Sequence, residues 1–406
     1  VPALRFPEFS EEWKRIRVSD LLDFYSTNSL SWEQLEYESN ELYNLHYGLI
    51  HVGLPTLVDL TKDELPSIKV DNVPKKYELC KEGDVAFADA SEDTNEVAKV
   101  VEFYNLDGKK VVCGLHTIHG RDNNEQTAKG FRGYCFSSTA FHNQIRRIAQ
   151  GTKIYSISTR NFSEVFVGLP SKSEQRKIAT LLKLIDDRIS TQNKIIEKYE
   201  SLIQAIIYKA KMNGISKGTW KRIDLYKVLQ ERNDKNVEGR TICSVSVSQG
   251  VVNQIEYLGR SFAAKQTSHY NVVKYGDIVY TKSPTGDFPY GIIKRSNIRE
   301  NVAVSPLYGV YIPVNDSIGV ILHFYFMRPS NAFNYLHPLI QKGAKNTINI
   351  TNRRFLENSV PLPISENEAN TIAGILKSIQ EKIEIEKSLL QSYTKEKEYL
   401  LRQMFI

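Results

Sequence analysis

The sequence predicts an α+β protein in which two similar strand-rich domains are joined by two long helices. The helices pack either with each other, as an antiparallel coiled coil with pseudo-two-fold symmetry, or each with a helix of another chain. An internal repeat predicts the two domains, because Phe162 and Val167-Gly168-Leu169-Pro170 recur as Phe355 and Val360-Pro361-Leu362-Pro363. After each Leu-Pro pair comes a long run of helix-forming residues, and the apolar positions of the two runs match at an offset of 194. A domain followed by a long helix, twice over, is typical of two binding sites held at a set distance.

The repeat extends upstream in the same order. Trp13-Lys14-Arg15-Ile16 recurs as Trp220-Lys221-Arg222-Ile223, Gly83-Asp84-Val85 as Gly276-Asp277-Ile278, and Gly151-Thr152-Lys153 as Gly343-Ala344-Lys345. Short β-branched and aromatic runs between Gly, Asp and Asn residues predict strands in both halves. We therefore expect a first domain over residues 1–170, a first helix over 171–213, a second domain over 214–363 and a second helix over 364–406.

Both predicted helices, Ser173 to Met212 and Glu366 to Met404, carry a coiled-coil pattern. Apolar residues recur at alternating spacings of four and three, starting from Ile178 in the first helix and Ile372 in the second. Gln192 and Glu386 interrupt both patterns at the same place, where they either leave a solvated gap or set the register. Ser173 and Ser365 are the expected N-caps, and Gly214 and Gly218 are expected to end the first helix.

The composition sets weaker limits. The chain has 406 residues, a net charge of +6, 41% hydrophobic and 25% charged residues, which is ordinary for a globular protein and compatible with nucleic acid without requiring it. No apolar run is long enough to cross a bilayer and no export signal is visible, so we expect a cytoplasmic location. The four cysteines lie far apart in the chain without a Cys-x-x-Cys pair, which argues for reduced thiols and against a zinc module.

Catalytic motifs are missing from the sequence. There is no Walker A loop, no Gly-x-Gly-x-x-Gly after a strand, and no Asn-Pro-Pro or Asp-Pro-Pro run of the kind that amino-methyltransferases use. The segment Gly214-Ile215-Ser216-Lys217-Gly218 has the spelling of a nucleophile elbow, but a helix precedes it where the elbow requires a strand. His116 and His119 with Asp122 lack a third firm ligand, so we predict no metal and no catalytic residue. The pattern favours a binding protein.

Polar loops at corresponding places in the two halves supply the side chains that bind DNA phosphates and base edges. The alternative is a set of turns whose side chains satisfy their own backbone, but the repetition of the Gly-x-Lys loops favours nucleic acid. Acidic residues of the first loop, such as Glu92 and Glu96, would repel phosphates, so part of that loop is expected to face away. The first-domain candidates are Asn44, His46, Tyr47, Ser91, Thr94, Asn95, His116, Lys153, Tyr155, Ser156 and Arg160. The second-domain candidates are Ser246, Ser248, Gln249, Lys282, Ser283, Thr285, Lys345, Asn346, Asn349, Asn352 and Arg353.

These motifs together resemble the specificity subunit of a type I restriction–modification system. The resemblance rests on Leu4-Arg5-Phe6-Pro7-Glu8-Phe9 before Trp13, the repeated Gly-Asp-Val/Ile and Gly-x-Lys segments, and Leu-Pro-x-x-x-Glu-Gln before a long helix. The best match is the segment from Leu169 to Ala179. Its second copy, Leu362 to Ala373, is one residue longer and has Glu368-Ala369 in place of Glu-Gln. The resemblance covers essentially the whole chain.

The resemblance implies two target-recognition domains that read a bipartite sequence in double-stranded DNA, interrupted by unspecified base pairs. It also implies two bound methyltransferase (modification) subunits, which methylate DNA adenine at N6 and are held largely through the helices, and restriction/translocase subunits recruited to them. S-adenosylmethionine, ATP and Mg²⁺ would belong to those partners, and this chain would need no cofactor and catalyse nothing. Apolar residues outside the main helical seam either widen that seam or bind the methyltransferase; they are Leu181, Ile195, Leu202 and Ile207.

Two other classes of function compete with this interpretation. One is a DNA-binding or structural scaffold without a methyltransferase partner, which a neighbouring methyltransferase gene would argue against. The other is an enzyme of unrecognised chemistry, which predicts turnover by the isolated chain.

Overall fold

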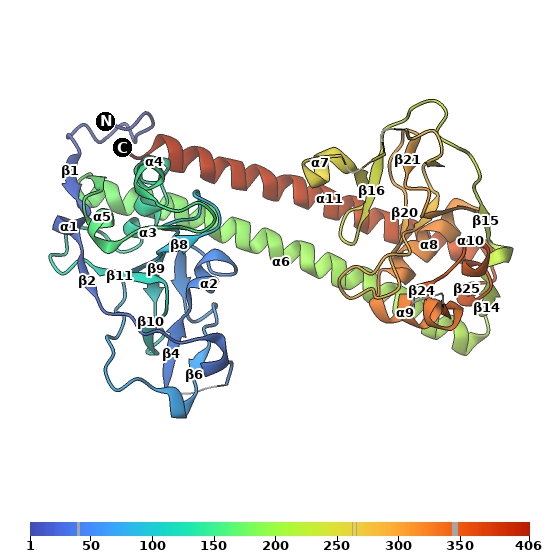
Figure 1. Cartoon of the computed structure of the whole chain (residues 1–406), viewed down its shortest axis with the longest axis horizontal. Helices are drawn as coiled ribbons and strands as arrows, with labels where there is room; N and C mark the ends of the chain where they lie inside the picture. The colour runs from blue at the N-terminus through green and yellow to red at the C-terminus, as the bar shows by residue number, and fades with distance from the viewer. Residues whose placement is uncertain (39–40, 262, 265, 343–347) are drawn as a thin grey trace. The chain divides into compact units, whose positions relative to one another are not determined.

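The computed structural model describes residues 1–38, 41–261, 263–264, 266–342 and 348–406, and the chain divides into two units (Figure 1). Unit 1 comprises Val1–Asn193 and Ser388–Ile406, and unit 2 comprises Lys194–Lys387. Each unit therefore contains one of the two sequence repeats together with part of each long helix. Among the described residues, no helix is long and apolar enough to cross a membrane.

The same strand pair leads into each long helix. In unit 1, β1 (Lys14–Arg17) pairs antiparallel with β13 (Phe166–Leu169), and Lys14 lies opposite Leu169. In unit 2, β14 (Trp220–Asp224) pairs in the same way with β25 (Ser359–Pro363). The repeated Trp-Lys-Arg-Ile segment thus lies beside the repeated strand that ends in Leu-Pro, which explains why the two motifs recur together.

The repeated Gly-Asp segment forms the same turn twice. Gly83 and Gly276 have left-handed backbones, with φ of 87° and 90°, which glycine adopts without steric cost. The carboxylate that follows each glycine accepts a hydrogen bond from the backbone N–H three residues earlier, at 2.8 Å for Asp84 and 2.7 Å for Asp277. Each buried aspartate is also paired with an arginine, Arg121 in unit 1 and Arg232 in unit 2.

Unit 1 is built on two mixed sheets. One has the strand order β10-β4-β6-β3 and the other β2-β11-β7-β9-β5, and a small third pair joins β12 to β8. The strands are β2 (Asp23–Tyr25), β3 (Leu35–Glu36), β4 (Leu42–Leu45), β5 (Leu57–Asp59), β6 (Ser67–Ile68), β7 (Val85–Ala88), β8 (Ala90–Ser91), β9 (Val100–Asn105), β10 (Lys110–Cys113), β11 (Thr117–Arg121) and β12 (Tyr155–Ser156).

Aromatic side chains form the centre of the larger unit 1 core. Phe87 of β7 packs against Phe136, Phe141 and Phe162, with ring centroids 4.6–6.5 Å apart. The helices that supply these rings therefore cover the five-stranded sheet. The helices of this unit are α1 (Val18–Leu21), α2 (Tyr47–His51), α3 (Phe131–Phe136), α4 (Thr139–Ile148) and α5 (Thr159–Ser163), with short 3-10 turns η1 (Trp32–Gln34) and η2 (Val70–Asn72).

Unit 2 has a four-stranded sheet of order β15-β22-β19-β20 and three further two-stranded pairs besides β14-β25 among its described residues. Its strands are β15 (Leu229–Glu231), β16 (Cys243–Ser246), β17 (Gly250–Asn253), β18 (Asn271–Val273), β19 (Ile278–Tyr280), β20 (Ile293–Arg295), β21 (Val302–Val304), β22 (Gly309–Pro313), β23 (Gln341–Lys342) and β24 (Ile348–Asn349).

The repeated phenylalanine of unit 2 is again central. Phe355 is fully buried and stacks between Tyr280 and Tyr311, at 4.7 Å from each ring. It belongs to a one-turn helix whose N-cap, Thr351, accepts a hydrogen bond from Arg354 N; Ser158 caps the equivalent turn around Phe162. The helices of this unit are α7 (Gln254–Leu258), α8 (Asp316–Phe326), α9 (Pro329–Leu336) and α10 (Asn352–Phe355), with 3-10 turns η3 (Leu225–Lys227) and η4 (His337–Leu339).

Two long helices, α6 (Lys172–Lys217) and α11 (Glu366–Gln403), run antiparallel within each unit. In unit 1, Asp186 pairs with Lys397 at 2.6 Å, and Arg188 donates to the hydroxyl of Tyr393 at 3.5 Å. The residue number thus rises along α6 while it falls along α11, as in an antiparallel pair. In unit 2, Lys387 lies 3.5 Å from Glu200, whereas Trp220, just after α6, bonds to Glu368 at the start of α11.

The buried seam of α6 departs from the predicted spacing near its end. Ile178, Leu182, Ile185, Ile196 and Ile203 are buried as expected, but Ile207 (3% exposed) is more deeply buried than Ile206. A straight helix turns about 100° per residue, so the 29 residues from Ile178 to Ile207 come to within about 20° of eight full turns. The prediction that Ile207 lies outside the seam is therefore wrong, because strict 3.5-residue periodicity drifts by about 20° per heptad on such a helix.

Both ends of α6 also differ from the prediction. The helix begins at Lys172, and the hydroxyl of Ser171, not that of Ser173, accepts the hydrogen bond from Glu174 N at 3.4 Å. It continues through Gly214 and ends at Lys217, where Gly218 takes a left-handed φ of 73°. Gly214 lies inside the helix, and Trp220 packs directly on it. A Cβ at position 214 would lie 1.8 Å from Trp220 Cδ1, so this position requires glycine. Ser365 caps α11 as predicted, accepting from Glu368 N at 3.5 Å.

The Glu-Gln pair after the first Leu-Pro anchors α6 to unit 1. Buried Glu174 receives two hydrogen bonds of 2.7 Å from Arg5, which ties the N-terminal arm to the helix. Gln175 accepts from Ala128 N at 2.7 Å and donates to Pro170 O at 2.9 Å. In unit 2, Glu368 instead accepts from Trp220 Nε1 at 2.8 Å, and Ala369 needs no polar partner. The signature residues are therefore structural.

The two helical glycines provide a matched test of this packing. Gly214→Ala should destabilise unit 2 by about 1–3 kcal/mol, because the added methyl group overpacks against Trp220. Gly374→Ala, in the exposed interior of α11 with nothing within 4 Å of the new Cβ, should stabilise by about 0.5–1 kcal/mol. Denaturant unfolding of both variants checks the pair; equal stability of Gly214→Ala and the unaltered chain would show that Trp220 is not seated on the helix.

Candidate nucleic-acid interface

Two predicted segments of unit 1 meet at a short strand pair. Ser91 on β8 lies opposite Tyr155 on β12, and Ser156 lies opposite Ala90. The loop before β12 contains Gly151 with φ of 145°, where a Cβ would come within 1.9 Å of Ile154 O. Glycine is therefore required for this tight loop, which leaves Lys153 exposed and Ile154 61% exposed at its tip.

An aromatic and histidine cluster lies next to this strand pair. Tyr47 is central, with ring centroids 4.7 Å from His46, 5.3 Å from His116 and 6.1 Å from His51. Trp32, 46% exposed, stacks on the other side of His46 at 4.3 Å. His51 Nε2 lies 3.0 Å from Ala90 O, which joins the cluster to β8. We call Trp32, His46, Tyr47, His51 and His116 the aromatic cluster; such rings suit stacking on exposed bases.

The loop after β8 is ordered by its own polar side chains. Asp93 accepts from Asn95 N at 2.9 Å, and Asn95 Oδ1 accepts from Arg146 at 2.7 Å. Glu96 is neutralised by Lys99 at 2.7 Å and lies 3.6 Å from His51. The expected repulsion between this loop and phosphates is thereby reduced at Glu96.

Two first-domain candidates, Asn44 and His46, are buried in unit 1. Asn44 on β4 is fully buried, and its side chain packs so closely on Gly114 that a Cβ there would lie 2.7 Å from Asn44 Oδ1. His46 is 4% exposed, and its Nδ1 accepts from Gly48 N at 3.1 Å as the N-cap of α2. Burial, and then the charge of His116, lower the pKa of His46 and keep it a neutral acceptor. Both are corrected to structural residues.

The remaining first-domain candidates are accessible. His116 is half exposed, has a left-handed φ of 54°, and approaches Asp89 at 3.2 Å; burial raises the pKa of Asp89. Tyr47, Ser91, Thr94 and Tyr155 are partly exposed, and Asn95, Lys153, Ser156 and Arg160 are exposed.

In unit 2, the β16–β17 hairpin presents Ser248 and Gln249 at its exposed turn, while Gly250 follows with φ of 75°. Ser246 is 4% exposed and bonds to Tyr257 at 3.1 Å, so it supports the hairpin and is corrected to a structural residue. Gln249 lines two hollows of about 810 and 660 Å³. The second of these is also lined by Lys294, Arg295 and His323.

A second group of unit 2 candidates surrounds Glu231. Asn352 donates to Glu231 at 2.6 Å, and its carbonyl accepts from Tyr311 at 3.1 Å, which assigns Asn352 a structural part. Lys282 has a left-handed φ of 62°; burial lowers its pKa, and the nearby Glu231 opposes that shift. Ser283, Thr285 and Arg353 are exposed. Lys345 and Asn346 lie outside the described residues, as does the side chain of Asn349.

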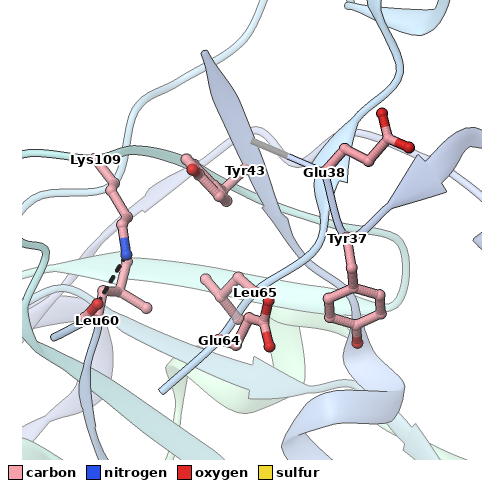
Figure 2. Close-up of a pocket in the computed structure, with 7 residues that line it drawn as sticks. All are labelled: Tyr37, Glu38, Tyr43, Leu60, Glu64, Leu65 and Lys109. Carbon is pink, nitrogen blue, oxygen red and sulfur yellow. Dashed lines mark hydrogen bonds between the residues drawn. The ribbon is translucent and has the colours of Figure 1, made fainter. Parts of the chain in front are cut away.

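An acidic hollow of about 140 Å³ occupies another part of unit 1 (Figure 2). Figure 2 shows Lys109 donating to Leu60 O, at 2.8 Å, on the side of the hollow away from Tyr37. The hollow is lined by Tyr37, Glu38, Tyr43, Leu60, Glu64, Leu65 and Lys109. Two exposed carboxylates, Glu38 and Glu64, would repel phosphates, so this part of the surface does not suit DNA.

Three residues of the unit 1 surface escaped the sequence analysis. Trp32 and His51 complete the aromatic cluster, and Arg146 holds Asn95. The spacing of four between Tyr47 and His51 could have indicated one helical face. Trp32 and Arg146 belong to other elements, so local sequence carried no signal for them.

Comparisons with known proteins give one family match over part of the chain and likenesses of fold. Residues 63–201 match the model of a family described as the type I restriction modification DNA specificity domain. The fold of the chain is similar to that of the type I restriction-modification S subunit from M. genitalium, with a TM-score of 0.60 and 15% identity, over 100% of this chain and 99% of that one. A chain from a structure of type I R-M complex assembly and conformational transition matches with a TM-score of 0.51 and 13% identity, over 97% of each chain. The predicted α+β fold class is confirmed.

His323, which lines the hollow beside Gln249, should make the stability of unit 2 depend on pH. Burial, and then the charges of Lys294 and Arg295, lower the pKa of His323 to about 3, and its Nδ1 accepts from Arg295 N at 3.1 Å. A histidine in the unfolded chain has a pKa near 6.5. The neutral His323 ring therefore stabilises the folded chain fully above about pH 6.5, and this stabilisation is lost as the pH falls from about 6.5 toward 3.

Between pH 7 and pH 5, the free energy of unfolding should fall by about 1–2 kcal/mol. Hydrogen exchange of the α8 amides, corrected for intrinsic rates, measures it within unit 2. His323→Gln keeps an acceptor but does not titrate and should flatten the dependence, whereas His269→Gln, at an exposed position, should not. A His323→Gln chain with an unchanged pH dependence would assign the effect to other groups.

Proposed function

We propose that this chain is a specificity subunit of a type I restriction–modification system, and that it reads a double-stranded DNA sequence split into two halves, one for each unit. The family match over residues 63–201 supports the DNA-recognition role, and with it a non-catalytic subunit. The observation that carries the bipartite proposal is the repeat: both units build the same strand pair, the same Gly-Asp turn and the same buried phenylalanine.

The accessible candidates divide by unit under this proposal. In unit 1, the aromatic cluster other than the buried His46, and the β8–β12 pair with its Lys153 loop, would contact one half-site. In unit 2, Ser248 and Gln249 of the hairpin and the Lys282–Thr285 segment would contact the other. Hydroxyls, amides and histidine rings bind base edges, while Lys153, Arg160 and Arg353 are suited to phosphates. Because the two sets differ in composition, the two half-sites should differ in sequence.

The long helices would set the gap between the half-sites. At 1.5 Å per residue, the 46 residues of α6 make a helix about 69 Å long, roughly two turns of B-DNA. A spacer built from helices is stiff, so the number of unspecified base pairs should be constant.

The proposal also includes partner subunits. One solved relative in fold comes from a structure of type I R-M complex assembly, which supports assembly of this chain with other subunits. We propose two methyltransferase subunits bound along the helices, with restriction/translocase subunits joining them. S-adenosylmethionine, ATP and Mg²⁺ would then act in those partners. Leu181 and Ile195 are half-buried, whereas Leu202 (44% exposed), Leu184 (56%) and Ile385 (67%) offer free apolar surface.

Selection of bound sequences from random duplexes, with the methyltransferase present, tests bipartite reading. Two conserved half-sites at a constant gap are expected. Tyr47→Ala should relax one half only, and Gln249→Ala the other, each by about 1–3 kcal/mol of discrimination at the affected bases.

Matched controls are Tyr37→Ala, in the acidic hollow, and Gln230→Ala, exposed on β15, which should leave the motif unchanged. A single uninterrupted motif, or relaxation of both halves by one variant, would contradict the assignment of one half to each unit.

Docking of the methyltransferase has its own test. Leu202→Glu with Ile385→Glu should weaken co-purification of the methyltransferase about tenfold or more, because two exposed apolar contacts become charged. Ser201→Glu, on the same helix, adds a charge at an exposed polar position and should have no such effect. Retained assembly in the double variant would remove this face from the interface.

A further inference from the structure

Two cysteines and a histidine of unit 1, distant in sequence, meet in its interior. Cys80 precedes β7, Cys113 ends β10, and His119 lies in β11; their exposed fractions are 6%, 1% and 1%. The two Sγ atoms are 3.5 Å apart, and one ligand atom from each of the three residues lies within 4.8 Å of the others. The sheets bring Cys80 and Cys113 together although the two residues lie far apart in the sequence.

His119 is oriented as metal-binding histidines are. Its Nε2 bonds to Asp84 at 2.8 Å, and Asp84 is itself held by Arg121 at 2.8–3.1 Å and by Lys81 N at 2.8 Å. The other ring nitrogen, Nδ1, is buried and has no hydrogen-bond partner among the described residues. A carboxylate on one nitrogen fixes the ring and leaves the second nitrogen free to ligate.

The spacing of the sulfurs suits a shared ion. With metal–sulfur bonds of about 2.3 Å in a tetrahedral site, two thiolate sulfurs lie about 3.8 Å apart, and the 3.5 Å here is within a few tenths of that value. A weak thiol–thiol hydrogen bond accounts for the sulfur pair, but it leaves His119 Nδ1 without a hydrogen-bond partner among the described residues.

Charge selects the ion. Two thiolates and a neutral imidazole balance a divalent cation, whereas a monovalent ion would leave a buried net negative charge, which is costly. Arg121 does not change this balance, because Asp84 and Glu78 already pair with it, at 2.8 and 2.9 Å. We propose that Cys80, Cys113 and His119 bind one Zn²⁺ ion in unit 1, with water in the fourth position.

The consequence is structural. Cys113 and His119 bracket the turn that carries His116 of the aromatic cluster, and they belong to the four-stranded and five-stranded sheets respectively. A bound ion would fasten these sheets together and fix that turn. The proposal does not depend on DNA reading, and it applies to unit 1, since Cys243 is the single cysteine of unit 2.

The test is the metal content of the full chain, purified under reducing conditions and measured by elemental mass spectrometry. One zinc per chain is expected, and Co²⁺ in its place should show sulfur-to-cobalt charge-transfer absorption. Cys80→Ser and Cys113→Ser should each lower zinc affinity at least tenfold. Cys135→Ser removes a buried cysteine of the same unit outside the trio and should retain the ion.

The unaltered chain alone can overturn the proposal, even if the variants fold poorly. Zinc binding by the reduced chain weaker than about 1 μM would do so, since a buried thiolate site binds far more tightly. So would a Co²⁺ spectrum without thiolate bands.

Discussion

The joint between each strand pair and the long helix beside it is the constraint on which the rest of the structure depends. In unit 1, β13 leads directly into α6, and Arg5 closes the joint by its paired hydrogen bonds to the buried Glu174. In unit 2, Trp220 fills the same role, since it packs on Gly214 at the end of α6 and donates to Glu368 at the start of α11. The carboxylate of Glu174 is buried and is stabilised by its pairing with Arg5. Separating the two side chains would leave an unpaired buried charge and destabilise the folded chain.

This joint explains how one scaffold can present two different surfaces. The shared parts, namely the strand pairs, the Gly-Asp turns and the buried phenylalanines, are interior and fix each unit to the helices. The loops that differ, such as the Tyr47 helix in unit 1 and the Ser248 hairpin in unit 2, are exposed and make few of these contacts. Sequence change in the loops therefore leaves the joint within each unit intact, which suits the proposed reading of two different half-sites.

The sequence was sufficient to predict the repeat, both long helices and several strands, because these depend on local periodicity and turn residues. It predicted the accessible site poorly where a polar side chain is buried. Asn44, His46 and Ser246 look like ordinary polar loop residues, and their burial follows from sheet packing that one segment does not reveal. Ile207 was misplaced because the helix keeps nearly 3.6 residues per turn. The meeting of Cys80 with Cys113, and of Trp32 with His46, depends on tertiary topology alone.

A genome-wide map of N6-methyladenine in the host, with and without this gene, most directly tests the proposal that the two units read two DNA half-sites. The account predicts the loss of one split motif, with a methylated adenine in each half and a constant gap between the halves. If the methylation map is unchanged by removal of the gene in a strain whose partner methyltransferase is expressed, the chain does not direct methylation and the central claim is wrong.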